Sequence, residues 1–180
     1  FLPYRTLKLP EGIGCYCLYH GNLSIAENEK AARWLIKEVF HDLKVPFVIT
    51  GKNPSPSLEK LAHGQVHTCI VANPGEKEMQ DMITKAQVNI LPSYNDTGVK
   101  LKLLNALYNG RHCVVNESTV KGSGLDAACH IASNAQGFKS IVSQLYHQPL
   151  GEEEYRLRSH LLQHAFDNKK NAERLIAWIW

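Results

Sequence analysis

The chain has 180 residues, about one domain at roughly 150 residues per domain, and is too short for two full α/β domains. Hydrophobic residues make up 44% of the sequence and charged residues 21%, which is typical of a folded globular protein and disfavours a fibrous repeat or long disorder. The net charge of +3 is too small to indicate nucleic-acid binding.

Short apolar runs alternate with amphipathic stretches along most of the chain. The runs predict strands at residues 15–20, 46–51, 67–73, 88–93 and 112–116, and a weaker one at 130–133. Helical spacing predicts helices at 27–42, 57–62, 76–86, 99–109, 135–147, 152–166 and 168–180. Continuously apolar strands separated by helices are buried on both faces, so we expect a three-layer α/β domain with a mainly parallel six-stranded sheet and a helical C-terminus.

The N-terminal segment bears on the domain organisation, and the cysteines and hydropathy bear on the location of the protein. Residues 1–14 hold two prolines and two glycines without any period, which predicts a linker from a preceding domain that is missing here, with the folded domain spanning 15–180. The five cysteines are an odd number and fall mostly in strand-like runs, where we expect reduced, buried thiols. With no membrane-spanning stretch in the sequence, we expect a cytoplasmic protein, the inner face of the membrane being the alternative.

The loops that follow the strands are the candidate binding region, because ligands of parallel sheets bind beyond the carboxyl ends of the strands. Gly21 and Asn22 follow the first strand, and Lys52 follows the second. After the fourth strand we expect Thr97 and Gly98 to begin a helix. Lys100 and Lys102 follow at once, and this combination suits a phosphate or diphosphate. The alternative is that Thr97 is an ordinary N-cap and the lysines are solvated.

Several nucleotide and metal motifs are absent from the sequence. No Gly-x-Gly-x-x-Gly follows the first strand and no Gly-Lys-Ser/Thr loop occurs, so dinucleotide and P-loop sites are disfavoured. No acidic pair ends a strand, so a metal-bound diphosphate is not indicated. His160 and His164 are one helical turn apart but lack a clear third ligand, which favours paired surface histidines. We therefore expect neither a metal site nor a cofactor.

One window of the sequence resembles a known family. PSYNDTGVKLKLLNALYNGRHCVVN, residues 92–116, is similar to the C-terminal domain of GT-B retaining glycosyltransferases, in the family called glycosyl transferases group 1. The resemblance rests on the order of a proline-ended strand, a Thr-Gly loop, a Leu-Leu-x-Ala-Leu helix ended by glycine, and an apolar strand. It extends over most of the chain, from Tyr19 to the terminal helices.

The resemblance implies a Rossmann-like, donor-binding domain that faces an N-terminal domain across a cleft. The domain would bind a nucleotide-diphosphate sugar for transfer to an acceptor hydroxyl, with retention and without metal, and this chain alone would be inactive. Family members usually carry two glutamates eight positions apart, where this sequence has Thr97 and Asn105. A basic pair near the first strand is also replaced, so the resemblance leaves Lys100, Lys102 or Lys52 to bind the diphosphate, and the catalytic residues stay unknown.

Two other functions remain open from the sequence. A nucleotide-sugar epimerase of the same two-domain architecture would use the same donor pocket. A degenerate domain retained for protein association would explain both the replaced glutamates and the apolar last helix.

Overall fold

A computed structural model describes residue 7 and residues 10–179, so most of the linker predicted at 1–14 lies outside the described residues. The strands are β1 (Cys17–Asn22), β2 (Phe47–Lys52), β3 (Thr68–Ala72), β4 (Val88–Ile90), β5 (His112–Val115) and β6 (His130–Ile131). The α-helices are α1 (Ala26–Trp34), α2 (Pro56–His63), α3 (Glu76–Lys85), α4 (Leu101–Asn109), α5 (Glu117–Val120), α6 (Ala135–Leu145), α7 (Glu152–Ala165) and α8 (Asn168–Ile179). A π-helical turn, Leu35–Val39, continues α1, and a 3-10 turn, Asp126–Ala128, precedes β6.

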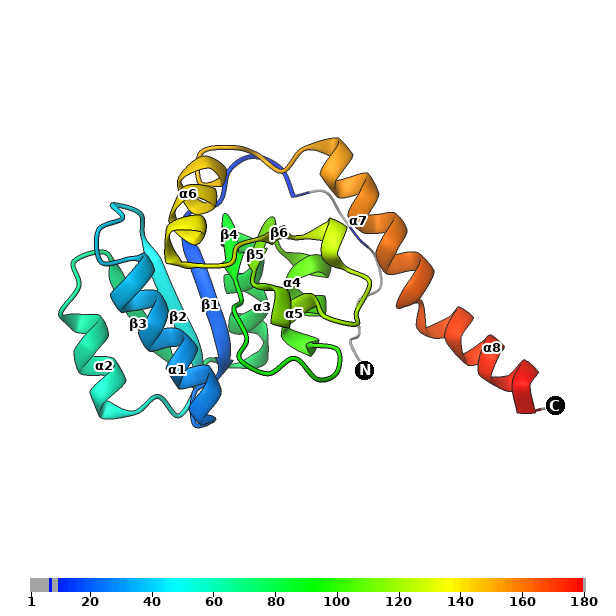
Figure 1. Ribbon diagram of the computed structural model, residues 1–180, viewed down its shortest axis with the longest axis horizontal. Coiled ribbons are helices and arrows are strands. Elements are labelled where there is room, and N and C mark those ends of the chain that lie inside the picture. The colour runs from blue at the N-terminus through cyan, green and yellow to red at the C-terminus, as the bar shows by residue number, and fades with distance from the viewer. Residues whose placement is uncertain (1–6, 8–9, 180) are drawn as a thin grey trace.

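The six strands form one sheet in the order β3-β2-β1-β4-β5-β6, and every strand pairing is parallel (Figure 1). The predicted α/β class, strand number and helical C-terminus are therefore confirmed. The chain crosses from β3 at one edge back to the centre at β4, so the strand order reverses between β1 and β4. Parallel sheets of this order bind ligands at that switch point, beyond the carboxyl ends of the strands.

Alternating side chains of the central strands face different helices. Tyr19 points toward α1, where its hydroxyl donates to the Asn28 carbonyl oxygen at 3.0 Å. Leu18 points the other way and packs with Val48 against Ile83 of α3. Because both faces of the sheet are covered, the strands read as continuously apolar runs rather than as alternating ones.

Two of the predicted buried thiols are exposed. All five cysteines are free, and Cys17 and Cys113 are buried. Cys15 lies before β1 begins, and Cys69 lies on the edge strand β3, so both are reached by solvent. An apolar run does not reveal which of its residues lie at the sheet edge.

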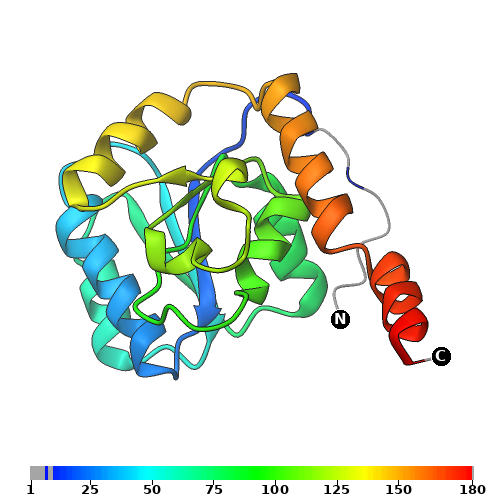
Figure 2. The same ribbon diagram turned by 45° about the vertical axis from the view of Figure 1, so that its right-hand side comes forward.

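The last two helices lie along one side of the domain (Figures 1 and 2). α7 buries Arg158 and Leu162, whereas α8 buries no residue and extends away from the body. None of the helices in the described part of the chain is long and apolar enough to span a bilayer.

Candidate functional site

Helices α1 and α4 begin close together at the switch point. Lys102, in the first turn of α4, donates a hydrogen bond from Nζ to Asn28 Oδ1 of α1 at 3.2 Å. The same Nζ lies 5.1 Å from the centre of the Tyr19 ring, at a distance that allows a cation–π interaction. The contact places a cationic side chain over the carboxyl end of β1.

Lys102 is a mostly buried cation that lacks an anionic partner. Burial, followed by repulsion from Lys100, lowers the pKa of Lys102 to about 8, against a smaller attraction from the carboxylate of Glu27. Within residues 10–179, no carboxylate lies at ion-pair distance from its Nζ. A mostly buried charge whose contacts are a neutral amide and an aromatic ring is stabilised by a bound anion.

His20 adds a second polar group, which has unused hydrogen-bonding capacity. Its side chain is 4% exposed, and its Nε2 has no hydrogen-bond partner. Burial, together with the charge of Lys102, lowers the pKa of His20 to about 3, so the ring is neutral at physiological pH. A buried, unpaired ring nitrogen is costly unless a ligand or water satisfies it.

The amino termini of α1 and α4 both lack a side-chain cap. The first N–H groups of a helix have no carbonyl partner within it, and together they attract anions. The first turn of α1 carries Glu27 and Glu29, whereas the first turn of α4 carries no acidic residue. The start of α4 is therefore the more favourable anion site.

The backbones of β1 and β2 approach each other closely near their carboxyl ends. Gly21 pairs with Gly51, and Asn22 pairs with Lys52. A Cβ on Gly51 would lie 1.7 Å from the Gly21 carbonyl oxygen, so only glycine fits there. The structure thus brings Gly21, Asn22 and Lys52 together at the end of the sheet that holds Lys102.

The loop before α4 differs from its sequence prediction. Helix α4 begins at Leu101 with Lys100 at the N-cap, so Thr97 and Gly98 do not begin the helix. Asn95 Oδ1 instead accepts hydrogen bonds from Thr97 N at 2.8 Å and Thr97 Oγ1 at 2.7 Å. Gly98 has φ +68°, a left-handed conformation that is incompatible with the helix.

The remaining predicted site residues divide between this loop and α4. Lys100 Nζ donates back to the Thr97 carbonyl oxygen at 2.5 Å, so Thr97, Gly98 and Lys100 form a compact exposed loop. Asn105 lies three residues after Lys102, hence on the same side of α4, and its Oδ1 accepts from Asn109 Nδ2 at 2.9 Å. Lys102 reaches across to Asn28 of α1, whose Nδ2 also donates to the carbonyl oxygen of Asn22 at 2.9 Å.

The sequence interpretation missed two polar residues of this region, His20 and Asn28. His20 precedes Gly21 at the end of the first strand, in the loop region where the sequence predicts binding. Asn28 lies in the first turn of α1, near the position where family members carry a basic residue. The position of His20 beside a strand-end glycine was an available signal, but the Asn28–Lys102 contact spans 74 residues and leaves no local pattern.

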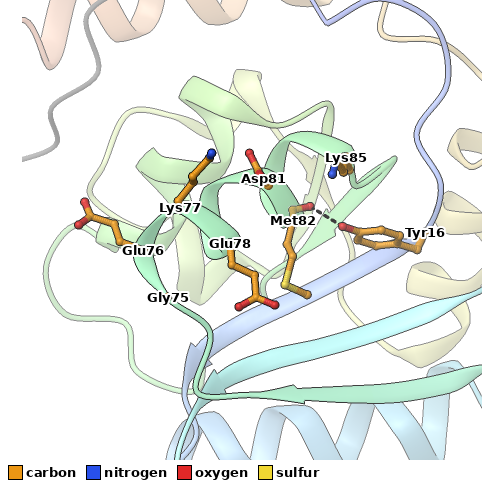
Figure 3. A pocket seen from close by; sticks show the side chains of 8 residues that line it. All are labelled: Tyr16, Gly75, Glu76, Lys77, Glu78, Asp81, Met82 and Lys85. Atoms are coloured by element: carbon orange, nitrogen blue, oxygen red, sulfur yellow. Dashed lines mark hydrogen bonds between the residues drawn. The ribbon is translucent and has the colours of Figure 1, made fainter.

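A shallow groove along α3 is a different feature (Figure 3). Tyr16 donates from its hydroxyl to the Met82 carbonyl oxygen at 3.0 Å on its wall. The charged residues that line it are three carboxylates and two lysines, namely Glu76, Glu78, Asp81, Lys77 and Lys85. A groove with excess negative charge does not suit a diphosphate.

Comparison with solved structures supports the fold. An α,α-trehalose-phosphate synthase (UDP-forming) from Burkholderia xenovorans matches with TM-score 0.66 and 11% identity, covering 83% of this chain and 40% of that one. A mutant of S. aureus TarM in complex with UDP, fondaparinux and alpha-GlcNAc-glycerol matches with TM-score 0.71 and 12% identity, covering 98% and 38%. A glycosyltransferase involved in avilamycin A biosynthesis matches with TM-score 0.66 and 13% identity, covering 92% and 51%.

The chain thus spans about half or less of the length of these structures. No curated protein matches its sequence. Residues 14–148, most of the chain, match the model of a family described as glycosyl transferases group 1. The chain belongs to this family of glycosyltransferases.

Proposed function

We propose that this chain is the donor-binding part of a glycosyltransferase and that it binds a nucleotide-diphosphate sugar at the switch point. The observation that carries the proposal is Lys102, a mostly buried cation without a carboxylate partner, at the uncapped start of α4. A diphosphate supplies the anion that this arrangement lacks.

The other residues of the region take supporting roles in the proposal. Gly21 and Gly51 let the donor approach the backbone, and Asn22 and Lys52 border the same edge. The loop of Thr97, Gly98 and Lys100 borders the sugar, as the family resemblance implies. Asn105, on the Lys102 side of α4, hydrogen-bonds the ribose hydroxyls.

The proposed reaction breaks the bond between the anomeric carbon and the diphosphate oxygen, and forms a bond from that carbon to the acceptor oxygen with retention. The acceptor hydroxyl gives its proton to the departing diphosphate oxygen, and the nucleotide diphosphate, which remains an anion, leaves. The charge of Lys102 and the amides at the start of α4 stabilise that anion without a metal.

The acceptor site belongs, in this proposal, to an N-terminal domain of the same protein. The support is the length of the solved structures, of which this chain spans 38–51%. A second support is α8, whose large apolar side chains Leu175, Ile176, Trp178 and Ile179 are all exposed. The chain alone is then expected to bind the donor without transferring its sugar.

Calorimetric titration with UDP and GDP tests donor binding. UDP is included because the TarM structure contains it. The parent chain should bind one of the two nucleotides at a single site, and Lys102→Ala should weaken binding about 10- to 100-fold, the effect of a hydrogen bond to a charged group. Lys77→Ala, an exposed lysine of α3, is the matched control and should bind like the parent. Equal affinity of the parent and Lys102→Ala would contradict the proposed site.

A second candidate is an association domain that has lost donor binding. The replaced glutamates at Thr97 and Asn105 and the exposed apolar face of α8 favour it. If neither UDP nor GDP binds the parent chain, this function becomes the better account.

A further inference from the structure

Three potential metal ligands meet beside β5 and β6, in a part of the structure that the proposed function does not use. His112 is the first residue of β5, His130 the first residue of β6, and Glu154 the third residue of α7. One ligand atom from each residue lies within 4.8 Å of the other two. The amino end of β5, where His112 lies, is opposite the strand ends that border Lys102.

The distances suit tetrahedral coordination. His112 Nδ1 lies 3.2 Å from Glu154 Oε2, and His130 Nε2 lies 3.4 Å from Glu154 Oε1. Zn²⁺ bonds to nitrogen and carboxylate oxygen are about 2.0–2.2 Å, which in a tetrahedron separates neighbouring ligand atoms by about 3.4 Å. Each imidazole nitrogen is therefore already separated from one oxygen of Glu154 by about the edge of such a tetrahedron, and the three ligand atoms lie within 4.8 Å of one another.

The hydrogen bonding of His112 independently indicates a missing cation. Its side chain is 3% exposed, with Nδ1 facing a carboxylate oxygen and Nε2 lying 2.9 Å from the Gln148 carbonyl oxygen. A neutral imidazole has one N–H, so either tautomer leaves a nitrogen lone pair facing an oxygen acceptor. A metal at Nδ1 resolves the conflict, with Nε2–H donating to the carbonyl as in most metal-bound histidines.

We propose that His112, His130 and Glu154 bind a divalent transition metal, with Zn²⁺ as the best fit to two imidazoles and one carboxylate. The fourth ligand is water, because the His130 side chain is 34% exposed and opens the site to solvent. Two ligands come from the sheet and one from α7, so the metal fastens this helix to the sheet.

Arg158 orients the carboxylate of Glu154 and lowers the expected affinity of the site for a metal ion. Its Nη2 donates to Glu154 Oε1 at 3.1 Å, and its Nη1 donates to the Gly110 carbonyl oxygen at 3.1 Å. Hydrogen-bonded carboxylate ligands are common in metal sites, but the guanidinium charge repels a dication. We therefore expect weaker binding than in a site of the same ligands without a neighbouring cation.

Titration of the metal-free 180-residue chain with Zn²⁺ tests the proposal, by calorimetry and by thermal unfolding. The chain should bind one Zn²⁺ and unfold at a higher temperature with it, and Co²⁺ should give the visible spectrum of a tetrahedral site. His130→Gln should weaken binding more than about tenfold and abolish that spectrum. This variant changes the partly exposed ligand, so it should fold, as circular dichroism would check.

The double variant His160→Gln, His164→Gln is the matched control. These histidines lie on the exposed side of α7 with ring centres 6.3 Å apart, and they report nonspecific binding to surface imidazoles. Zn²⁺ affinity should be unchanged in this variant. Absence of stoichiometric binding by the parent chain would overturn the proposal and leave a proton on His112 as the missing cation. The proposal would also be overturned if His130→Gln still bound Zn²⁺ and the double variant did not.

Discussion

Two polar regions of this domain differ in how their charged groups are paired within the chain. At the switch point, Lys102 is mostly buried without a carboxylate partner, and its contacts are an amide oxygen and an aromatic ring. Beside β5, the carboxylate of Glu154 has three partners at ion-pair distance, Arg158, His112 and His130. The first region is the proposed diphosphate site and the second the proposed metal site. Glu154 forms an ion pair with the buried Arg158, whereas Lys102 forms none with a described residue, so substitution of the two residues should change stability in opposite directions.

The largest effect is expected from Glu154→Gln. Loss of the carboxylate leaves the buried Arg158 without its ion-pair partner, which should lower the free energy of unfolding by about 3 kcal/mol. Chemical denaturation of the metal-free chain at neutral pH measures the loss. Glu153→Gln, at the exposed neighbouring position, is the control and should change stability by less than about 0.5 kcal/mol.

The pH dependence of this loss provides a further check. Burial alone would raise the pKa of Glu154, but hydrogen bonds from His112 and His130 and the charge of Arg158 hold it far below its usual value. The stabilisation is present above the ordinary carboxyl pKa of about 4.5 and is lost as the pH falls below it. The difference between parent and variant should therefore shrink in acid, and a constant difference would argue against an ionised Glu154.

The next largest effect is expected from Lys102→Met, with the opposite sign. Removal of a mostly buried cation that forms no ion pair within the described part of the chain should raise the free energy of unfolding by about 2 kcal/mol at pH 7 and weaken nucleotide binding about 10- to 100-fold. Thermal and chemical unfolding measure the first effect and calorimetry the second. Lys77→Met is the exposed control, and destabilisation by Lys102→Met would show that the ammonium group is satisfied within the chain.

The affinity for a nucleotide diphosphate should depend on pH through the same lysine. The pKa of Lys102 lies at about 8, below its ordinary 10.5, so the free chain loses this charge as the pH rises through 8. Affinity for UDP or GDP should fall by up to about tenfold per pH unit above 8. Lys102→Arg keeps the charge at these pH values, so calorimetry should find a flatter profile; the same slope in both proteins would exclude Lys102 as the cause.

The smallest effect is expected from Asn105→Ala. Its side chain already bonds Asn109 within α4, and a hydrogen bond to a ribose hydroxyl contributes about 1 kcal/mol. Nucleotide affinity should therefore fall only about three- to fivefold, measured in the same titration as Lys102→Ala. A loss as large as that of Lys102→Ala would mean that the ribose contact is as important as the diphosphate contact.

Most of the fold was predictable from local pattern, because buried parallel strands and amphipathic helices have distinct periods. The start of α4 was not, because the Asn95 side chain and the left-handed Gly98 hold Thr97 in a loop. Propensity favours Thr97 as an N-cap, but a competing hydrogen bond two residues away decided its conformation. Lys102 was predicted as a site residue, whereas its contact with Asn28 was not.

The sequence by itself determined the class of the domain, the order of its elements and the loops in which a binding site would lie. Only the tertiary structure decided which polar groups meet and which remain without a partner. His112 and Glu154 are 42 residues apart, and neither their spacing nor their neighbours reveal the cluster that they form with His130. Periodicity records which side of an element is buried, but contacts between elements depend on how the strands are ordered in the sheet.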